Sequence, residues 1–175
     1  MSQQSISNFS SKLLILFWFS MVFSVVLNTV FWFSATMFNA EWFNASFPID
    51  VSLPLSNARS LIGYFPSMIS TLLTVALLWQ LIVLFRLYEK GIIFQLQNAE
   101  CFKKLSYLLI TTPFVEFLMG VLLSFALSYN DGNWNTSFSI DDSDITMMII
   151  GFIVRVIAVV MEKAADLQEE SELTV

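Results

Sequence analysis

Two ionisable side chains lie inside stretches of the chain that are otherwise strongly apolar. Glu116 stands within residues 105–128 and Arg155 within residues 145–161. In a helix each lies roughly 15 Å from the start of its stretch, so two antiparallel membrane spans would hold both charges near the middle of the bilayer. An unpaired charge there costs at least about 2.5–3.5 kcal/mol. We therefore predict a Glu116–Arg155 ion pair, which either fixes the register of two helices or acts as a proton relay, an ion relay or a switch.

The polar residues of these apolar stretches recur at helical spacing. Thr112, Glu116 and Ser124 fall on one stripe, because residues four apart share a helix face. Asn28 and Gln80 are the amide side chains of two further apolar stretches. Small and hydroxyl residues on such stripes let membrane helices approach closely and form hydrogen bonds across the contact. We expect Thr112 and Ser124 in the interior of a helix bundle, with Asn28 in its outer half and Gln80 in its inner half.

Composition limits the chemistry that this chain can perform. The 175 residues include no His, which excludes Ser-His-Asp triads and His metal sites. The single cysteine, Cys101, excludes an intrachain disulfide, CxxC redox chemistry and a thiolate zinc cage. Asp141, Asp142 and Asp144 could bind a divalent cation weakly, but such acidic residues are more typical of a helix start. We expect no catalytic residues, no metal site and no cofactor, and we do not expect an enzyme.

The elements that must position these residues are membrane-spanning helices. The chain is 57% hydrophobic and 13% charged, with a mean hydropathy of +0.73, whereas soluble domains carry about 25% charged residues. A span needs roughly 20 mostly apolar residues and must satisfy its backbone polar groups internally. The stretches that meet these demands are residues 13–38, 65–85, 105–128 and 145–161. The predicted fold is all-α, a single membrane domain built as an integral membrane four-helix bundle.

Basic residues in the connecting segments predict the orientation of this bundle. Residues 86–104 are rich in Lys and Arg, whereas residues 129–144 contain aspartates and no basic residue. Lys and Arg concentrate in cytoplasmic loops, so we expect both termini in the cytoplasm. The predicted layout is a cytoplasmic loop at residues 86–104, outer loops at residues 39–64 and 129–144, and an acidic cytoplasmic tail at residues 162–175.

Local signals outline a surface on the cytoplasmic side. Gly91, following Lys90, is typical of a helix C-cap, and Asn98 is a suitable N-cap for the next helix. Acidic residues near a helix C-terminus oppose the helix dipole, so the tail is not built for helix stability alone. The tail either folds back on basic residues of the loop as a latch or forms a docking site for a basic partner. The residues of this predicted partner surface are Lys90, Phe94, Lys103, Lys104, Glu169, Glu170 and Glu172.

Two of these segments resemble a known family. Residues 88–94 read Tyr-Glu-Lys-Gly-Ile-Ile-Phe, residues 102–105 read Phe-Lys-Lys-Leu, and the chain ends Leu-Gln-Glu-Glu-Ser-Glu-Leu-Thr-Val. With Asn98 and four predicted spans, they resemble the bacterial membrane family catalogued as domain of unknown function 2975, the YoaS-like proteins. The family ending is similar to Leu-x-Glu-Glu-Asn-Asp-Leu-Thr-(Ile/Val), and Ser171 and Glu172 replace its Asn and Asp here. The resemblance implies a multi-pass protein of a bacterial plasma (cytoplasmic) membrane, with no assigned reaction.

The resemblance also implies a partner. Genes of this family often neighbour a small helix-turn-helix regulator, which implies a membrane-bound regulatory protein that binds a cytoplasmic DNA-binding regulator. We expect the lipid bilayer and this regulator as partners, no direct binding of nucleic acid, and a chain that could form a homo-oligomer. The alternative function is a small transporter or channel that uses Glu116 and Arg155.

Overall fold

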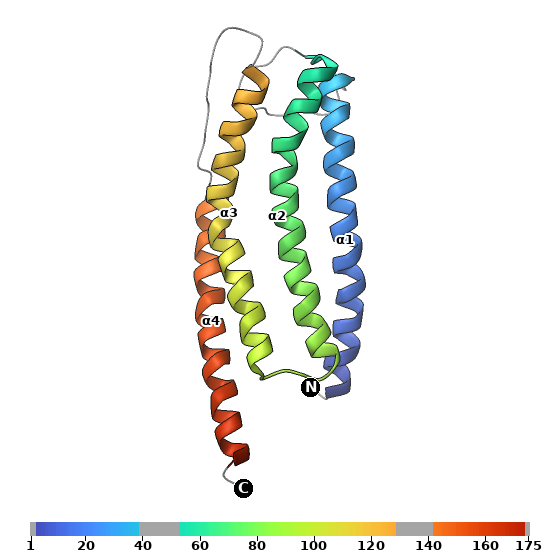
Figure 1. Cartoon of the computed structure of the whole chain (residues 1–175). Helices are drawn as coiled ribbons and strands as arrows, with labels where there is room; N and C mark the ends of the chain where they lie inside the picture. Colours follow the sequence, from blue (N-terminus) through green and yellow to red (C-terminus); the bar gives the residue numbers. More distant parts are fainter. Residues whose placement is uncertain (1–2, 39–52, 129–141, 174–175) are drawn as a thin grey trace.

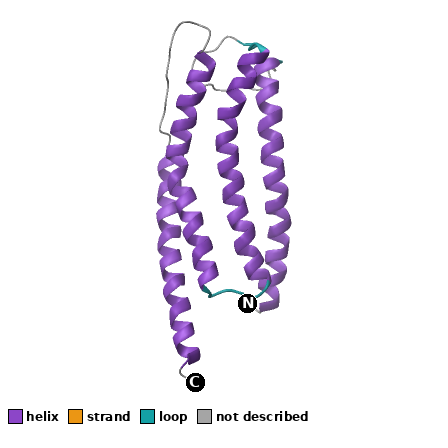
Figure 2. Cartoon of the chain, viewed as in Figure 1, coloured by secondary structure: helices purple, strands orange, loops and turns teal. Residues whose placement is uncertain are grey.

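The computed structural model describes residues 3–38, 53–128 and 142–173, and these residues are almost entirely helical (Figure 1, Figure 2). The helices are α1 (Gln3–Met37), α2 (Asn57–Glu89), α3 (Leu96–Ser128) and α4 (Asp142–Leu173). Each is long and apolar enough to cross a membrane. The described residues contain no strand. The predicted all-α fold, with four helices that could span a bilayer, is confirmed.

The helices are longer than the apolar stretches that predict them. α2 begins at Asn57 within the predicted outer loop, and it continues to Glu89. α3 already begins at Leu96, so the predicted loop at residues 86–104 shrinks to residues 90–95. The tail is helical as far as Leu173. The helices thus continue into the segments predicted as loops, because a helix that satisfies its own backbone hydrogen bonds can extend beyond the hydrocarbon region. The bounds of the spans within the membrane stay a prediction.

Short local signals begin and end the helices. Ser56 caps the start of α2, where its side chain accepts a hydrogen bond from the backbone N–H of Arg59 at 3.5 Å. Gly91 follows the end of α2 with a φ of 76°, a left-handed conformation that favours glycine and closes a helix as predicted. Asp142 and Asp144 lie in the first turn of α4, where negative charge interacts favourably with the helix dipole.

Each helix packs against its neighbour in the chain. α1 packs along α2, α2 along α3 and α3 along α4, and no other pair of helix backbones comes close together among the described residues. Both chain ends and the loop at residues 90–95 lie at one end of the molecule, which we call the terminal end (Figure 1). The bundle is therefore an open row, in which the backbones of α1 and α4 each run beside a single helix. Such a row is stable in lipid because apolar faces need no protein cover there.

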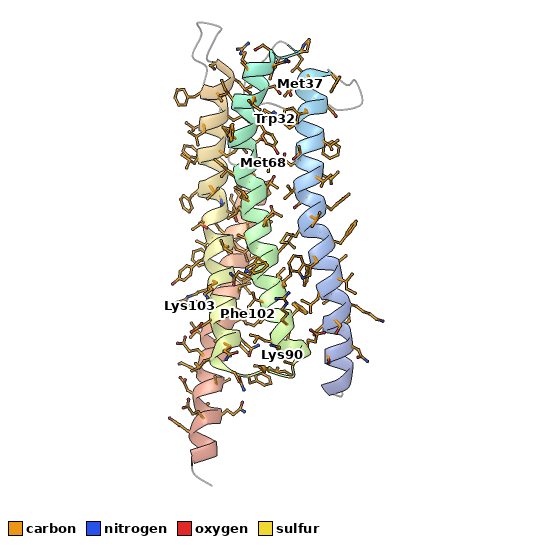
Figure 3. All side chains as sticks on the ribbon, turned by 45° about the vertical axis from the view of Figure 1, so that its right-hand side comes forward. Trp32, Met37, Met68, Lys90, Phe102 and Lys103 are labelled. Carbon is orange, nitrogen blue, oxygen red and sulfur yellow. The ribbon has the colours of Figure 1, made fainter. Side chains whose placement is uncertain are left out.

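A cluster of buried hydrophobic residues lies at the end opposite the termini. Trp32 packs there with Leu55, Leu123 and Leu127, and so joins α1 to α2 and α3. The indole Nε1–H of Trp32 donates a hydrogen bond to the backbone carbonyl of Ser60 at 2.8 Å. Figure 3 shows the Trp32 side chain in this region. An aromatic ring with its polar atom satisfied thus fastens α1, α2 and α3 together.

α4 is displaced along α3 toward the terminal end. Gly151 lies directly against Ile110, because a Cβ atom added to Gly151 would lie 2.7 Å from Ile110 Cγ1 and 3.0 Å from Ile110 N. Counting from this contact along antiparallel helices, α4 begins beside Met119, roughly 13 Å before α3 ends. At the other end α4 extends roughly 12 Å past the start of α3, as Figure 1 also shows. The contact face carries buried small residues seven apart, namely Gly151, Ala158 and Ala165.

Candidate functional site

Glu116, the acidic residue within the third apolar stretch, lies in the middle part of α3 and faces α2. Its Oε2 accepts a hydrogen bond from Ser70 Oγ at 2.9 Å, and the Glu116 side chain is half-buried. Ser70 comes from the middle of α2, so the contact joins two helices. Burying a carboxyl group in apolar surroundings costs less free energy when a hydroxyl donates a hydrogen bond to it than when the carboxyl group has no partner. Sequence reasoning did not single out Ser70 as the partner of Glu116.

Arg155 has a different partner. Its guanidinium lies over the ring of Tyr107, 5.1 Å from the ring centroid. Counting from the Gly151–Ile110 contact, Arg155 is level with Ser106 and roughly 15 Å along the helix axis from Glu116. No ion pair joins the two charges, and the predicted Glu116–Arg155 pair is wrong. The prediction measured depth from the ends of the apolar stretches, and the displacement of α4 moves Arg155 away from the level of Glu116.

Because Glu116 and Arg155 lie apart, we predict that the effects of mutating them on the free energy of unfolding are additive. Glu116→Gln and Arg155→Gln should change the free energy of unfolding independently, with a coupling energy below about 0.5 kcal/mol, because distant sites without shared partners are usually additive. Glu116→Gln combined with Ser70→Ala should show a larger coupling, because those side chains touch. A double-mutant cycle on unfolding in mixed micelles measures both values. Coupling above about 1 kcal/mol between Glu116 and Arg155 would mean that the two charges meet.

The other polar residues predicted for the bundle interior have varied surroundings. Asn28 Nδ2 lies 3.1 Å from Met68 Sδ and also donates to a backbone carbonyl of α2, so Asn28 links two helices. The hydroxyls of Thr112 and Ser124 donate to backbone carbonyls one turn earlier in α3. Ser124 is buried and Thr112 is half-buried. Gln80 is half-buried, and it makes no hydrogen bond to another described residue. Asn28 lies toward the end opposite the termini and Gln80 toward the terminal end.

Asn98 holds the loop between α2 and α3 in place. Its side chain is fully buried, its Oδ1 accepts a hydrogen bond from Gln95 N at 3.3 Å, and its Nδ2 donates to Ile92 O at 3.1 Å. Asn98 is the third residue of α3, so the prediction that it is the N-cap is wrong. Its side chain instead binds the backbone N–H of Gln95, just before the helix, as the residue at the third helical position does in a capping box. The loop is thereby fixed beside the end of α4.

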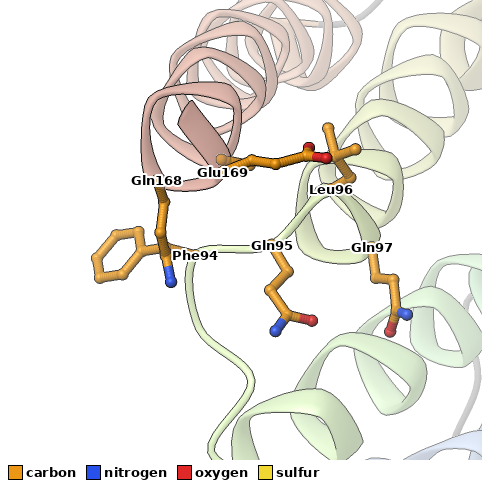
Figure 4. Close-up of a pocket in the computed structure, with 7 residues that line it drawn as sticks. Phe94, Gln95, Leu96, Gln97, Gln168 and Glu169 are labelled. Atoms are coloured by element: carbon orange, nitrogen blue, oxygen red, sulfur yellow. The ribbon is translucent and has the colours of Figure 1, made fainter. Parts of the chain in front are cut away.

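The projecting end of α4 and this loop enclose a shallow pocket of about 240 Å³. Figure 4 shows the Glu169 side chain extending from α4 in the direction of Leu96, whereas the Phe94 ring points the other way. Ala165 contributes the small residue that lets the loop come close to α4. The lining residues are Phe94, Gln95, Leu96, Gln97, Ala165, Gln168 and Glu169. Sequence reasoning missed Ala165 and Gln168, although the repeat of small residues seven apart in α4 pointed to this face.

The predicted partner surface is only partly brought together. Phe94 and Glu169 both line the pocket, and Lys90 and Glu170 are exposed at the same end. The side chain of Glu172 lies outside the described residues, although its backbone belongs to α4.

As far as Glu170, the described part of the tail does not fold back on Lys103 and Lys104, which is one of the two arrangements considered above. Because α4 continues straight, Glu169 lies roughly 16 Å along the axis from the level of Lys103. Lys103 and Lys104 are both exposed, higher on α3. The acidic end of α4 therefore points away from these lysines rather than folding back on them.

The chain was compared with protein-family models, curated proteins and solved structures. Residues 12–175 match the family described as "Protein of unknown function (DUF2975)". No curated protein and no solved structure matches the chain. The matched region includes the whole of α2, α3 and α4 and most of α1, so it covers both the helix contacts and the pocket at the terminal end. The chain belongs to the DUF2975 family.

Proposed function

We propose that this protein is a membrane-anchored regulatory protein whose terminal end binds a cytoplasmic helix-turn-helix regulator. The observation that supports this function is the end of α4, which extends roughly 12 Å past the start of α3 and carries exposed acidic residues (Figure 1). Those residues are Asp166, Glu169 and Glu170. A helix that needed only to cross the membrane would end sooner and would not concentrate negative charge at its C-terminus.

The chemistry of this end suits a basic partner. DNA-binding proteins concentrate Lys and Arg on the face that contacts the DNA phosphates. Acidic side chains on a helix carry the same negative charge as those phosphates and can bind the same face. Leu167 is 66% exposed among the acidic residues and offers an apolar contact. Glu169 also lines the pocket at this end, and its carboxylate is a suitable partner for a Lys or Arg side chain. A regulator held in this way would have part of its DNA-binding face covered.

Charge reversal on α4 tests this proposal. The double variant Glu169→Lys, Glu170→Lys should weaken binding of the purified regulator encoded beside the gene by roughly tenfold or more, because like charges would face each other across the interface. Binding is measured with the full chain in lipid nanodiscs. The dissociation constant of the unmodified chain should also rise with salt, because the attraction is between exposed charges.

Glu100→Lys is the matched control. Glu100 is an exposed glutamate at the same end of the molecule, but it lies on α3 and not on the projecting part of α4. Its reversal should leave the affinity within about twofold, since a rim charge away from the contact has little effect. Equal losses in both variants would assign the effect to net charge and remove α4 from the proposal. A regulator that does not bind the unmodified chain would end the proposal itself.

The alternative function, a small transporter or channel, relied on Glu116 and Arg155 acting as a pair in the middle of the membrane. Glu116 instead contacts Ser70, and Arg155 contacts Tyr107.

A further inference from the structure

A cationic cluster lies on α3 and α4 near the terminal end. The Arg155 guanidinium covers the ring of Tyr107, which is 51% exposed. Lys103 and Lys104 precede Tyr107 by four and three residues, so all three occupy neighbouring positions on one side of α3. Both lysines are exposed, and Figure 3 shows Lys103 on the outside of α3. We call Lys103, Lys104, Tyr107 and Arg155 the Arg155 cluster.

Arg155 needs an anion that the described part of the chain does not supply. It is half-buried in a helix whose neighbouring residues are apolar, and it contacts an aromatic ring and no carboxylate among the described residues. A charge at the edge of the hydrocarbon is costly unless it reaches a partner or the headgroup region. A guanidinium pairs especially well with phosphate, because its planar N–H groups bind two oxygens at once.

The surroundings of the cluster are apolar on one side and polar on the other, as a lipid molecule is. Toward the middle of the membrane, Phe114 follows Tyr107 by two turns and is 64% exposed, and Phe152 precedes Arg155 by about one turn and is 54% exposed. The nearby carboxylates, Glu100 on α3 and Glu162 on α4, lie on the terminal side of the cluster and are exposed. Cations thus lie between an uncovered apolar face and a polar end.

We propose that the Arg155 cluster binds the phosphate of an anionic glycerophospholipid whose acyl chains lie along Phe114 and Phe152. Arg155 and the two lysines supply the positive charge, and Tyr107 holds the guanidinium at the surface while offering its hydroxyl to the headgroup. A headgroup with net negative charge is preferred over a zwitterionic one, because the cluster has more cations than the carboxylates at its edge can balance.

Lipid retention measured by native mass spectrometry tests this site. The full chain, purified in detergent, is titrated with phosphatidylglycerol and with phosphatidylcholine. The unmodified chain should prefer phosphatidylglycerol, and Arg155→Gln should weaken its binding roughly fivefold. The double variant Lys103→Gln, Lys104→Gln removes exposed side chains only, so it should fold normally and show a comparable loss. It keeps the test decisive if Arg155→Gln does not fold.

Lys12→Gln is the matched control, because Lys12 is exposed near the terminal end of α1, a helix without contact to α4. Its phosphatidylglycerol affinity should equal that of the unmodified chain. An equal loss in Lys12→Gln, or no loss in Arg155→Gln and the double lysine variant, overturns the site. Full displacement of the lipid by millimolar inorganic phosphate also overturns it, because the acyl chains would then contribute nothing.

Discussion

Replacing Trp32 with alanine should lower the free energy of unfolding by roughly 3–5 kcal/mol, the range for removing a large buried aromatic side chain. Trp32 is 8% exposed and is the largest member of the cluster that joins α1, α2 and α3. Its loss leaves a cavity beside Leu127 and leaves the carbonyl of Ser60 without its indole donor. Unfolding of the purified chain in mixed micelles, followed by loss of helical circular dichroism, measures the change.

Two variants separate packing from the hydrogen bond. Trp32→Phe keeps an aromatic ring but loses the N–H donor, so its cost should be smaller, and the hydrogen bond itself accounts for about 0.5–1.5 kcal/mol of it. Trp79→Ala removes the same side chain from a site that is 44% exposed and should cost less than Trp32→Ala. A Trp79→Ala cost equal to that of Trp32→Ala would contradict the role of the buried cluster.

Substituting Gly151 with alanine should loosen α4 from α3, at a cost of roughly 1–3 kcal/mol typical of overpacking. The new methyl group would lie 2.7 Å from Ile110 Cγ1 and 3.0 Å from the backbone nitrogen of Ile110. The side chain can rotate away, but the backbone of α3 cannot, so the helices must separate. α3 is the only helix that α4 contacts in the described residues. Hydrogen exchange should therefore rise in α4 and stay unchanged in α1 and α2.

Gly120→Ala is the matched control in the neighbouring helix. Nothing lies within 4 Å of a Cβ atom added at Gly120. The same substitution there should be neutral or stabilising by up to about 1 kcal/mol, because alanine favours a helix more than glycine does. If Gly151→Ala behaves like Gly120→Ala, the close approach of α3 and α4 is not what holds α4 in place.

The contact between α2 and α3 could have been read from the sequence. Their connection is so short that it fixes their register, and equal counts on either side of it reach residues at the same level. Glu116 stands 20 residues after Leu96, and 20 residues before Glu89 is Ile69, beside Ser70. The partner of Glu116 was thus within reach of simple counting, once the helix ends are known.

The position of α4 could not be found in this way. Residues 129–141 separate it from α3, and a connection of that length lets one helix slide along the other. Its apolar stretch is also shorter than those of the other helices, so depth measured from the ends of the stretch was a poor guide. Gly151 and the small residues Ala158 and Ala165 set the register by close packing. Their interval of seven residues does not indicate which residues of α3 they contact.

The pocket at the terminal end shows a similar limit. Phe94 and Glu169 were predicted to share a surface, and they do line one pocket. Asn98 was assigned to the helix start from its residue type alone, whereas its place depends on which residue begins α3. Residue type indicates that Asn98 takes part in capping. It does not distinguish the N-cap itself from the residue three positions later, whose side chain binds the backbone N–H of the N-cap.

In the described part of the chain each helix packs lengthwise only along its neighbours in sequence, and this order has a consequence for biosynthesis. α1 and α2 can form their hairpin as soon as both have left the ribosome, and α3 and then α4 can each join a surface that already exists. In a closed bundle the first helix would stay incomplete until the last one arrived. Here synthesis from the N-terminus to the C-terminus and assembly of the molecule can proceed in the same order.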